Sequence, residues 1–292
     1  MELNENKNFR SFTPYFANMH LHSTHSDGQF TPYQLAILAK SLGYGGVVLS
    51  DHDVISGVRE LTRLAEKIGI KSMSGVEFTC RQWGVGFHIL GYDFDVDNIE
   101  LITFVKRLCK YRNDHTRELL EAGLSRGTLK GITWQEVIDR NPENEWFCND
   151  QVCRAMVDKG IIHKEDWEEI HKVNFSYDSP YALPIKEASV EEAVKYIRKA
   201  GGIAVLAHPK NQYEYVDKLV KIGIQGIEVC HPMLDEEDEK MFRRKAEQLK
   251  LYKTGGTDHT GPMGGYMGSY AVPAFHGALE DDYIEIKERR FG

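Results

Sequence analysis

Histidine and carboxylate residues gather where short apolar runs of the sequence end. Four runs show this pattern: residues 16–19 precede His20 and His22, residues 47–49 precede Asp51 and His52, Val76 precedes Glu77, and residues 204–207 precede His208. Imidazole nitrogens and carboxylate oxygens are the ligands by which zinc, manganese and iron are bound in proteins. The sequence therefore predicts a metal site that is built from distant parts of the chain.

His20 and His22 are spaced as two ligands on one face of a strand. Successive side chains of a strand alternate between its two faces, so residues two apart point the same way. Two further segments supply the same residue types: His88 lies within the apolar run 87–90, and Asp258 and His259 follow the run 251–256. Such residues at the ends of several parallel strands are typical of the active site of a barrel enzyme.

Strand-length apolar runs alternate with helix signals along most of the chain. Thr31, Pro32 and Gln34 form a helix start with a capping box, and Ser189 and Glu192 form a second one. The pattern predicts strands at 16–19, 45–50, 71–77, 86–92, 203–207, 226–230 and 251–255, and helices at 32–42, 57–68, 190–200, 214–222 and 235–249. Alternation with right-handed crossovers predicts a parallel sheet, and about seven strands predict that it closes into a barrel.

Residues 98–185 interrupt this alternation of strand and helix signals. The stretch is more charged and helical in pattern, with helix-like runs at 119–126 and 134–140 and a turn-rich sequence at 141–144. An insertion between two barrel strands lies beside the strand ends where ligands collect. We therefore predict a barrel domain formed by residues 15–97 and 186–292, and an inserted helical cap domain at 98–185. A packing elaboration without substrate contact is the alternative for this insert.

Length, charge and composition disfavour several classes of protein. The chain has 292 residues, of which 41% are hydrophobic, and this is enough for one large core with an inserted module. A net charge of -8 disfavours binding of duplex nucleic acid, which needs a basic face. The five cysteines form no C-x-x-C pair, and no apolar segment approaches the roughly 20 residues needed to cross a bilayer. We expect a cytoplasmic protein without a membrane partner, and the sequence leaves the oligomeric state open.

Seven short motifs occur in a characteristic order along the chain. They are His20-Leu21-His22-Ser23 with Ser26-Asp27-Gly28, Ser50-Asp51-His52-Asp53, Gly75-Val76-Glu77, His88-Ile89-Leu90-Gly91-Tyr92, Leu206-Ala207-His208-Pro209, Gly226-Ile227-Glu228-Val229 and Gly256-Thr257-Asp258. Over residues 18–262, their order and spacing resemble the PHP (polymerase and histidinol phosphatase) family, in particular its stand-alone metal-dependent phosphoesterases. The resemblance implies an α/β fold, a distorted (β/α)7 TIM-like barrel with an inserted helical cap.

The resemblance also implies two or three divalent metal ions of manganese, iron or zinc. By position, the first ion is held by His20, His22, Glu77 and Asp258. The second is held by Glu77, His88 and His208, and the third by Asp27 and His52. A carboxylate can bind two cations whereas a neutral imidazole offers one lone pair, so Glu77 is the natural bridge. Asp51 and Asp53 flank His52 and are predicted to accept its second ring proton, which gives Asp51 a supporting catalytic role.

The sequence departs from the family pattern in two places. The family usually has Asp-x-His where this chain has Asp258, His259 and Thr260, so Thr260 replaces the expected third-site histidine. Either His259 reaches the site through a local backbone change, or the third ion is held weakly and water takes the place of the missing ligand. Asn149-Asp150-Gln151 stands where many relatives have Arg-Pro-His, so substrate specificity does not transfer directly from them.

The predicted reaction is in-line hydrolysis of a phosphomonoester or diester. Metal ions lower the pKa of bound water from about 15.7 to near 7 and so supply hydroxide at neutral pH. The candidate groups for substrate contact are Arg112, Asn113, Arg154, Lys186 and Lys210, and His231 is a candidate to protonate the leaving group or to orient the substrate. The expected substrate is a small nucleotide, a sugar phosphate or a short oligonucleotide such as RNA.

Two other functions fit the same residues. Histidine and aspartate clusters on barrels also serve amidohydrolase-type enzymes that cleave carbon-nitrogen or carboxyl ester bonds, although no lysine at a strand end suits the carbamylated ligand of that class. A metal-binding module whose catalytic activity has decayed is the non-enzyme alternative, and Thr260 is the feature that suggests it.

Overall fold

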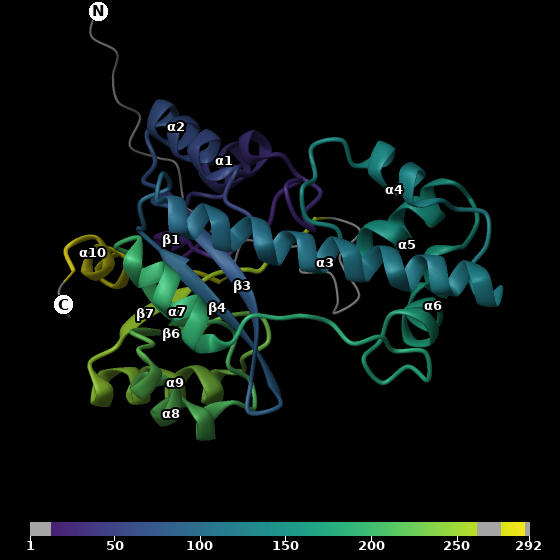
Figure 1. The fold of residues 1–292 in the computed structure, drawn as a ribbon. Helices are drawn as coiled ribbons and strands as arrows, with labels where there is room; N and C mark the ends of the chain where they lie inside the picture. The colour runs from purple at the N-terminus through teal and green to yellow at the C-terminus, as the bar shows by residue number, and fades with distance from the viewer. Residues whose placement is uncertain (1–12, 262–275, 290–292) are drawn as a thin grey trace, which may run out of the picture.

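The computed structural model describes residues 13–261 and 276–289 and has a mixed α/β architecture (Figure 1). Within these residues the strands are β1 (Ala17–Asn18), β2 (Gly46–Val47), β3 (Gly75–Gln82), β4 (Val85–Tyr92), β5 (Ile203–Leu206), β6 (Gly226–Cys230) and β7 (Tyr252–Gly255). β1 pairs with β2, and β3 to β7 form a second sheet in sequence order. Each predicted strand is therefore present, although β1 and β2 are shorter than predicted.

Backbone contacts beyond the strand ends join the two sheets into a ring. His52, which follows β2, forms a bridge with Glu77 of β3. On the other side, Leu21 after β1 forms a parallel bridge with His259 after β7. The chain thus returns from the seventh strand to the first, and the expected distorted seven-stranded barrel is confirmed.

One strand runs against the predicted direction. β4 is antiparallel to both β3 and β5, whereas β5, β6 and β7 are parallel, so the prediction of an all-parallel sheet is wrong at β4. The reason is local, because only Trp83 and Gly84 connect β3 to β4. Their φ angles of 51° and 80° are those of a tight hairpin turn, and such a turn replaces the crossover helix.

The hairpin changes the position of two predicted metal ligands. Glu77 is the third residue of β3 and His88 lies within β4, so both are inside strands rather than at strand ends. The register pairs Glu77 with Leu90 and Thr79 with His88. Residues that pair across two strands point to the same face, so the side chains of Glu77 and His88 share one face of the hairpin.

Helices cover the outside of the barrel strands. They are α1 (Pro32–Ser41), α2 (Val58–Ile68), α7 (Val190–Lys199), α8 (Val216–Ile222), α9 (Glu236–Leu249) and α10 (Glu280–Lys287), with a short 3-10 turn at Tyr213–Tyr215. Both predicted capping boxes form, since the side chain of Thr31 accepts from the amide of Gln34 and that of Ser189 accepts from the amide of Glu192. Within the described residues, no helix is both long and apolar enough to cross a membrane.

The insert contributes α3 (Ile99–Arg126), α4 (Trp134–Arg140), α5 (Asn149–Asp158) and α6 (Trp167–Asn174). Figure 1 shows α4, α5 and α6 grouped around the far end of α3. Along α3, Leu101 and Phe104 pack in the barrel core, whereas Leu119 and Leu120 pack in a second core made by the other insert helices. This long helix therefore connects the barrel to the cap. The domain limits at residues 98 and 185 stay a prediction.

Candidate metal centre

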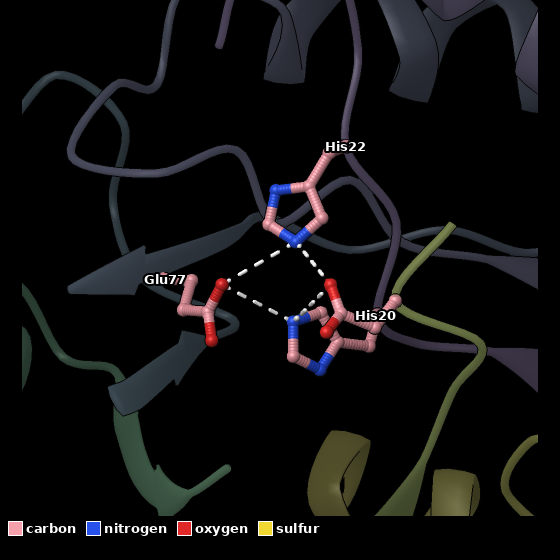
Figure 2. A group of neighbouring side chains, drawn as sticks. His20, His22 and Glu77 are labelled. Carbon is pink, nitrogen blue, oxygen red and sulfur yellow. Dashed lines mark ion pairs between the residues drawn. The ribbon is translucent and has the colours of Figure 1, made fainter. Parts of the chain in front are cut away.

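Glu77 lies in the middle of a cluster of imidazoles and carboxylates. Its side chain is buried, and its Oε2 atom lies 3.2 Å from His20 Nε2 and 3.3 Å from His22 Nε2. Figure 2 shows both imidazoles turned toward the carboxylate of Glu77. Asp258 completes this group, because its Oδ1 atom lies 2.8 Å from His22 Nε2 and 3.6 Å from His20 Nε2.

The second oxygen of Glu77 faces a different pair of histidines. Oε1 lies 2.9 Å from His88 Nδ1 and 3.0 Å from His208 Nε2, and the two imidazole nitrogens are 3.1 Å apart. The two oxygens of one carboxylate thus point to two separate groups of nitrogen atoms. This is the arrangement that a bridging ligand between two cations requires.

A third group forms around Asp27. Its carboxylate oxygens lie 3.5 Å from His22 Nδ1 and 4.0 Å from His52 Nε2. The other ring nitrogen of His52, Nδ1, lies 3.1 Å from Glu77 Oε2. The separations around Asp27 are therefore wider than those in the first two groups.

His259 lies outside these groups. Its ring packs against Phe30, with 5.6 Å between ring centroids, and no group of possible metal ligands among residues 13–261 and 276–289 includes it. Thr260 instead lines the same cavity as Asp27 and His52. Of the two alternatives for the third site, this placement favours a site that lacks one protein ligand.

The donor atoms of the cluster fit a metal ion. Among the described residues, five buried atoms of this cluster form no hydrogen bond: His20 Nε2, both ring nitrogens of His22, His52 Nδ1 and Glu77 Oε2. Leaving such an atom unsatisfied costs about 1–3 kcal/mol, so a cluster of them indicates a missing partner. Atoms that bind one ion at about 2.1 Å lie about 3.0 Å apart in octahedral and about 3.4 Å apart in tetrahedral geometry. The observed separations in the first two groups agree with these values.

The carboxylates alter the pKa values of the histidines that face them. Burial is the largest single influence on His20 and His22, and it lowers both pKa values. The carboxylates more than offset it, Glu228 most strongly for His20 and Asp27 for His22, so the pKa of His20 lies well above its usual range and that of His22 rises to about 9. Burial prevails at His52, whose pKa falls to about 4.

The two central carboxylates are ionised at neutral pH. Burial alone raises the pKa of Glu77, but His52 and His20 outweigh it and hold that pKa well below its usual range. Burial also raises the pKa of Asp258, which His20 and His22 then lower well below its usual value. Both carboxylates are therefore available as charged ligands for a cation once the neighbouring imidazoles release their protons.

Glu228 is a functional residue that the predicted ligand sets did not contain. It is fully buried in β6, and its carboxylate oxygens lie 3.1 and 3.2 Å from Nδ1 of His20. Its Oε2 atom also accepts the backbone N–H of His208 at 2.8 Å. A carboxylate on the far nitrogen of a ligand histidine fixes the tautomer and turns the other lone pair inward. The signal in the sequence was a glutamate inside an apolar run, because glutamate is almost never fully buried unless it is paired.

His231 supports Asp258 rather than facing the cavity. It is fully buried; its Nδ1 accepts the backbone N–H of Met233 at 3.0 Å, and its Nε2 lies 3.3 Å from Asp258 Oδ2. Because Nδ1 acts as an acceptor, the ring proton lies on Nε2 and is donated to the carboxylate. This contact orients Asp258 toward His20 and His22.

Asp51 holds a loop rather than the ring of His52. Its oxygens accept hydrogen bonds from the amide of Ser23 (2.6 Å), from the hydroxyl of Ser23 (2.7 Å) and from the hydroxyl of Ser26 (2.6 Å). The ring nitrogens of His52 face other carboxylates, as described above. The contribution of Asp51 to the site is therefore to shape the loop that carries Asp27.

A cavity of about 560 Å³ connects the cluster to the cap. Its barrel side includes Asp27, His52, His88, His208 and Asp258, and its cap side includes Arg112, Thr116, Leu119, Trp146 and Phe175. The barrel side thus carries the candidate ligands, whereas the cap side combines apolar and aromatic surface with polar and charged groups, among them Arg112, Asn149 and Asp150. A small molecule in this cavity would contact both.

Trp146 is a second residue that the sequence did not single out. Its indole stacks on the imidazole of His52, with 4.9 Å between the centroids and 19° between the planes. Its Nε1 donates to Asp53 at 3.1 Å, and the guanidinium of Arg112 lies 5.5 Å from its ring centroid. A cap residue therefore packs directly against a candidate metal ligand.

Two of the five predicted substrate-binding residues line the cavity. Arg112 does so with a side chain that is 13% exposed, and its nearest carboxylate is that of Glu187 at 3.9 Å. Lys210 also lines the cavity, but its ammonium group already pairs with Asp235 at 3.1 Å and with Asp238. Arg112 is therefore the better placed of the two for contact with an anion.

The other three predicted residues are turned elsewhere. Asn113 hydrogen-bonds the backbone on both sides of Trp146, at 2.8 and 2.7 Å. Arg154 donates to the carbonyl of Asp27 at 2.6 Å. Lys186 lines a separate cavity of about 480 Å³ and is not among the residues around the cluster. The first two thus support the site indirectly.

Comparisons with known proteins match this chain over most of its length. The model of the PHP domain family matches residues 18–287. The 3',5'-nucleoside bisphosphate phosphatase of Chromobacterium violaceum is 30% identical over 258 residues, which cover 84% of this chain and 87% of the relative. A 5'-3' exoribonuclease of Haemophilus influenzae is 26% identical, with 85% of this chain and 90% of the relative covered.

Solved structures agree with these relatives. A crystal structure from Bifidobacterium adolescentis, named as a candidate metal-dependent phosphoesterase, has a TM-score of 0.82 and 25% identity to this chain. The match covers 94% of this chain and 96% of that one. The chain therefore belongs to the PHP domain family of metal-dependent phosphoesterases.

Proposed function

We propose that this protein hydrolyses the phosphate monoester of a small nucleotide, with two or three divalent ions bound in the cluster around Glu77. The cavity carries this proposal, because one volume of about 560 Å³ joins the candidate ligands to apolar and aromatic side chains of the cap. Cavities of this size hold small molecules. A phosphoryl group at the ligand end and a nucleoside at the cap end would use both sides of it.

Each ion has a defined set of candidate ligands. The first would be held by His20, His22, Glu77 and Asp258, the second by Glu77, His88 and His208, and the third by Asp27 with His52. Imidazole and carboxylate ligands suit manganese, iron or zinc. When bound, such ions polarise phosphoryl oxygens and lower the pKa of water. Glu228 and His231 would keep His20 and Asp258 oriented for this task.

Arg112 is placed to bind the phosphate from the cap side. A guanidinium presents parallel N–H donors that match phosphate oxygens, and partial burial strengthens such contacts. Trp146 lies beside it and is 4% exposed, so it forms a wall that limits the access of bulk water. We assign phosphate binding to Arg112, with Lys210 as a weaker second cation because two carboxylates already neutralise it.

The relatives support the class of substrate. The Chromobacterium violaceum relative is named for nucleoside bisphosphates, and the Haemophilus influenzae relative is named for the 5'-3' degradation of RNA. Phosphorylated nucleotides are common to both names. The cap of this chain carries Asn149-Asp150-Gln151 in place of the usual family sequence, so we assign a class of substrate rather than one compound.

Steady-state assays test this function. Purified protein with added manganese is given nitrophenyl phosphate, its diester analogue, nucleoside monophosphates and bisphosphates, a short RNA, and esters and amides without phosphorus. We expect nucleotide monoesters to have the highest kcat/KM and a chelator to abolish turnover. Replacing Arg112 by methionine should raise KM for nucleotides about tenfold or more, because a hydrogen bond to a charged group contributes about 1.5–3 kcal/mol. Arg117→Met, at an exposed cap position, is the control.

Other outcomes identify the alternatives. Faster turnover of diesters or of RNA would replace the monoester with an oligonucleotide as substrate. Turnover of esters or amides without phosphorus, and of nothing else, would assign the amidohydrolase-type activity. No turnover by fully metallated protein would leave a metal-binding module without catalysis.

A further inference from the structure

The loop that carries Asp27, residues 23–28, is held from two sides. On the barrel side it is bound by Asp51 through the hydrogen bonds described above. On the cap side three consecutive carbonyl groups accept hydrogen bonds: His25 from the amide of Glu145 (3.2 Å), Ser26 from Nε2 of Gln151 (2.6 Å) and Asp27 from Nη1 of Arg154 (2.6 Å). The backbone of this loop is thus fixed by residues of the inserted helices.

Gln151 and Arg154 act from one face of α5. They are three positions apart, and residues at this spacing on a helix are neighbours. Their exposed fractions are 1% and 7%. The side chain of Gln151 is also fixed at its other end, because its Oε1 accepts the amide of Cys148 at 2.9 Å. We name Gln151 and Arg154 the cap clamp.

The third ligand group depends on this loop more than the other two groups do. Glu77 and His88 lie within paired strands, and the strand ladder holds their backbone in place. Asp27 lies in a turn outside any strand, and a ligand on a loop is only as well positioned as the loop itself. Thr260 stands where the family pattern has a histidine that would be a further ligand of the third ion. The third ion therefore depends more strongly on the position of Asp27.

We propose that Gln151 and Arg154 are positioning residues that hold Asp27 for the third ion, so that the cap controls the occupancy of this site while the barrel alone holds the first two ions. The proposal rests on the metal centre of the proposed phosphoesterase. Its test uses metal binding rather than turnover, which allows the two proposals to fail separately.

The test is a calorimetric titration of the full-length, metal-free protein with manganese. We expect the weakest of three binding events to become at least about tenfold weaker in Gln151→Leu and in Arg154→Met, because outer groups that orient a ligand typically contribute 10-fold to 100-fold to metal affinity. Asp27→Asn should affect the same event. Arg154→Lys, which keeps a donor for the carbonyl, should retain most of the affinity.

Two controls carry the same substitutions at exposed positions of the cap. Gln135→Leu and Arg117→Met remove side chains that bond to Asp139 and Glu121 on their own helices, so all three events should stay unchanged. Thermal unfolding shows which variants keep the native fold. Hydrogen exchange of the metal-free protein gives a second measurement, in which the amides of residues 24–28 should exchange faster in the clamp variants.

Several results would overturn the proposal. It is wrong if wild-type protein binds only two ions, if the weakest event is the same in both clamp variants, or if all three events weaken equally. It stands if the weakest event alone responds, even when no phosphate ester is hydrolysed, and in that case the proposed function fails. If nucleotides are hydrolysed but the weakest metal-binding event is the same in the wild type and in the clamp variants, the proposed function stands and the role of the cap clamp is rejected.

Discussion

The two sides of the cavity are built from different chemistry. On the barrel side, the ligand groups around Glu77 consist of imidazoles and carboxylates that contact one another at about 3 Å, and His20, His22 and Glu77 at their centre are buried. On the cap side, apolar and aromatic side chains such as Leu119 and Trp146 alternate with uncharged polar and titratable groups, and Arg112 is the best placed cation. The barrel side can bind metal and activate a phosphoryl group, but it offers little that distinguishes one organic group from another.

From this difference we expect the barrel to carry out the reaction and the cap to select the substrate. Catalysis requires ligands at fixed separations, and paired strands provide them. Selection requires a shaped surface, and helices on an insertion can change without disturbing the strands. Substitutions on the barrel side should therefore affect metal binding and kcat, whereas those on the cap side should affect mainly KM.

The largest effect is expected at Glu77. Replacing it by glutamine keeps the shape of the side chain but removes the charge that two ligand groups share, so activity should fall about a thousandfold or more. The measurement is kcat with saturating manganese, together with the number of bound ions. Glu121→Gln, on the exposed face of α3, serves as the control. A variant that retains more than a tenth of the activity would remove Glu77 from the centre of the mechanism.

The pH dependence of metal binding should be the next largest effect. The pKa of His22 is about 9 without metal, so its imidazole is protonated below that pH and an incoming ion must displace the proton. Displacing the His22 proton alone makes the apparent affinity rise about tenfold per pH unit up to about pH 9, and displacing the proton of His20, whose pKa is also raised, makes the rise steeper. Calorimetry in buffers of different ionisation enthalpy measures the proton release. An affinity that does not change with pH would contradict the coupling.

A substitution of Glu228 tests how much the orientation of His20 contributes to metal binding, because Glu228 contacts His20 but is not one of the ligands assigned to the first ion. Glu228→Gln removes the charge behind His20 without removing a donor atom from the first ligand group, so metal affinity and activity should fall about 10-fold to 100-fold. Metal titration and kcat should change together. Glu236→Gln, which is exposed on α9, is the matched control and should have no effect. A loss as large as that of Glu77→Gln would mean that Glu228 binds metal directly.

The smallest effect is expected on the cap side, at Trp146. Replacement by phenylalanine removes the hydrogen bond to Asp53 and part of the stacked surface, which contributes about 0.5–1.5 kcal/mol. KM for a nucleotide should therefore rise about threefold to tenfold, while the two tighter metal-binding events stay unchanged. Trp83→Phe, at the exposed hairpin turn, is the control. If kcat falls and KM stays the same, the division between barrel and cap is too simple at this position.

The types and local spacing of the ligands could be predicted from the sequence. His20 and His22 follow a strand-like run, and a short run between turn signals specifies a buried strand whichever partner it pairs with. The capping boxes at Thr31 and Ser189 were predictable for the same reason, because each depends on four consecutive residues. Features of this kind are decided within a few residues of the chain.

Other features depended on contacts between distant residues. The direction of β4 was predicted incorrectly, because the period of a strand carries no information about its direction and the turn at Trp83 and Gly84 was not recognised. Glu228 and Trp146 were missed as parts of the site, since each acts through a residue more than 90 positions away. The replacement of a family histidine by Thr260 was visible in the sequence, but where the ring of His259 would lie was not.

By itself the sequence determined which atoms are available as ligands, which segments become strands and helices, and the family to which the chain belongs. Three features were decided by the tertiary structure alone. The two oxygens of Glu77 face different histidines, Glu228 contacts Nδ1 of His20, and α5 hydrogen-bonds the loop that carries Asp27. The physical reason is that residue type and local period are properties of short segments, whereas the atoms that finally meet are set by strand register and by the packing of helices against strands.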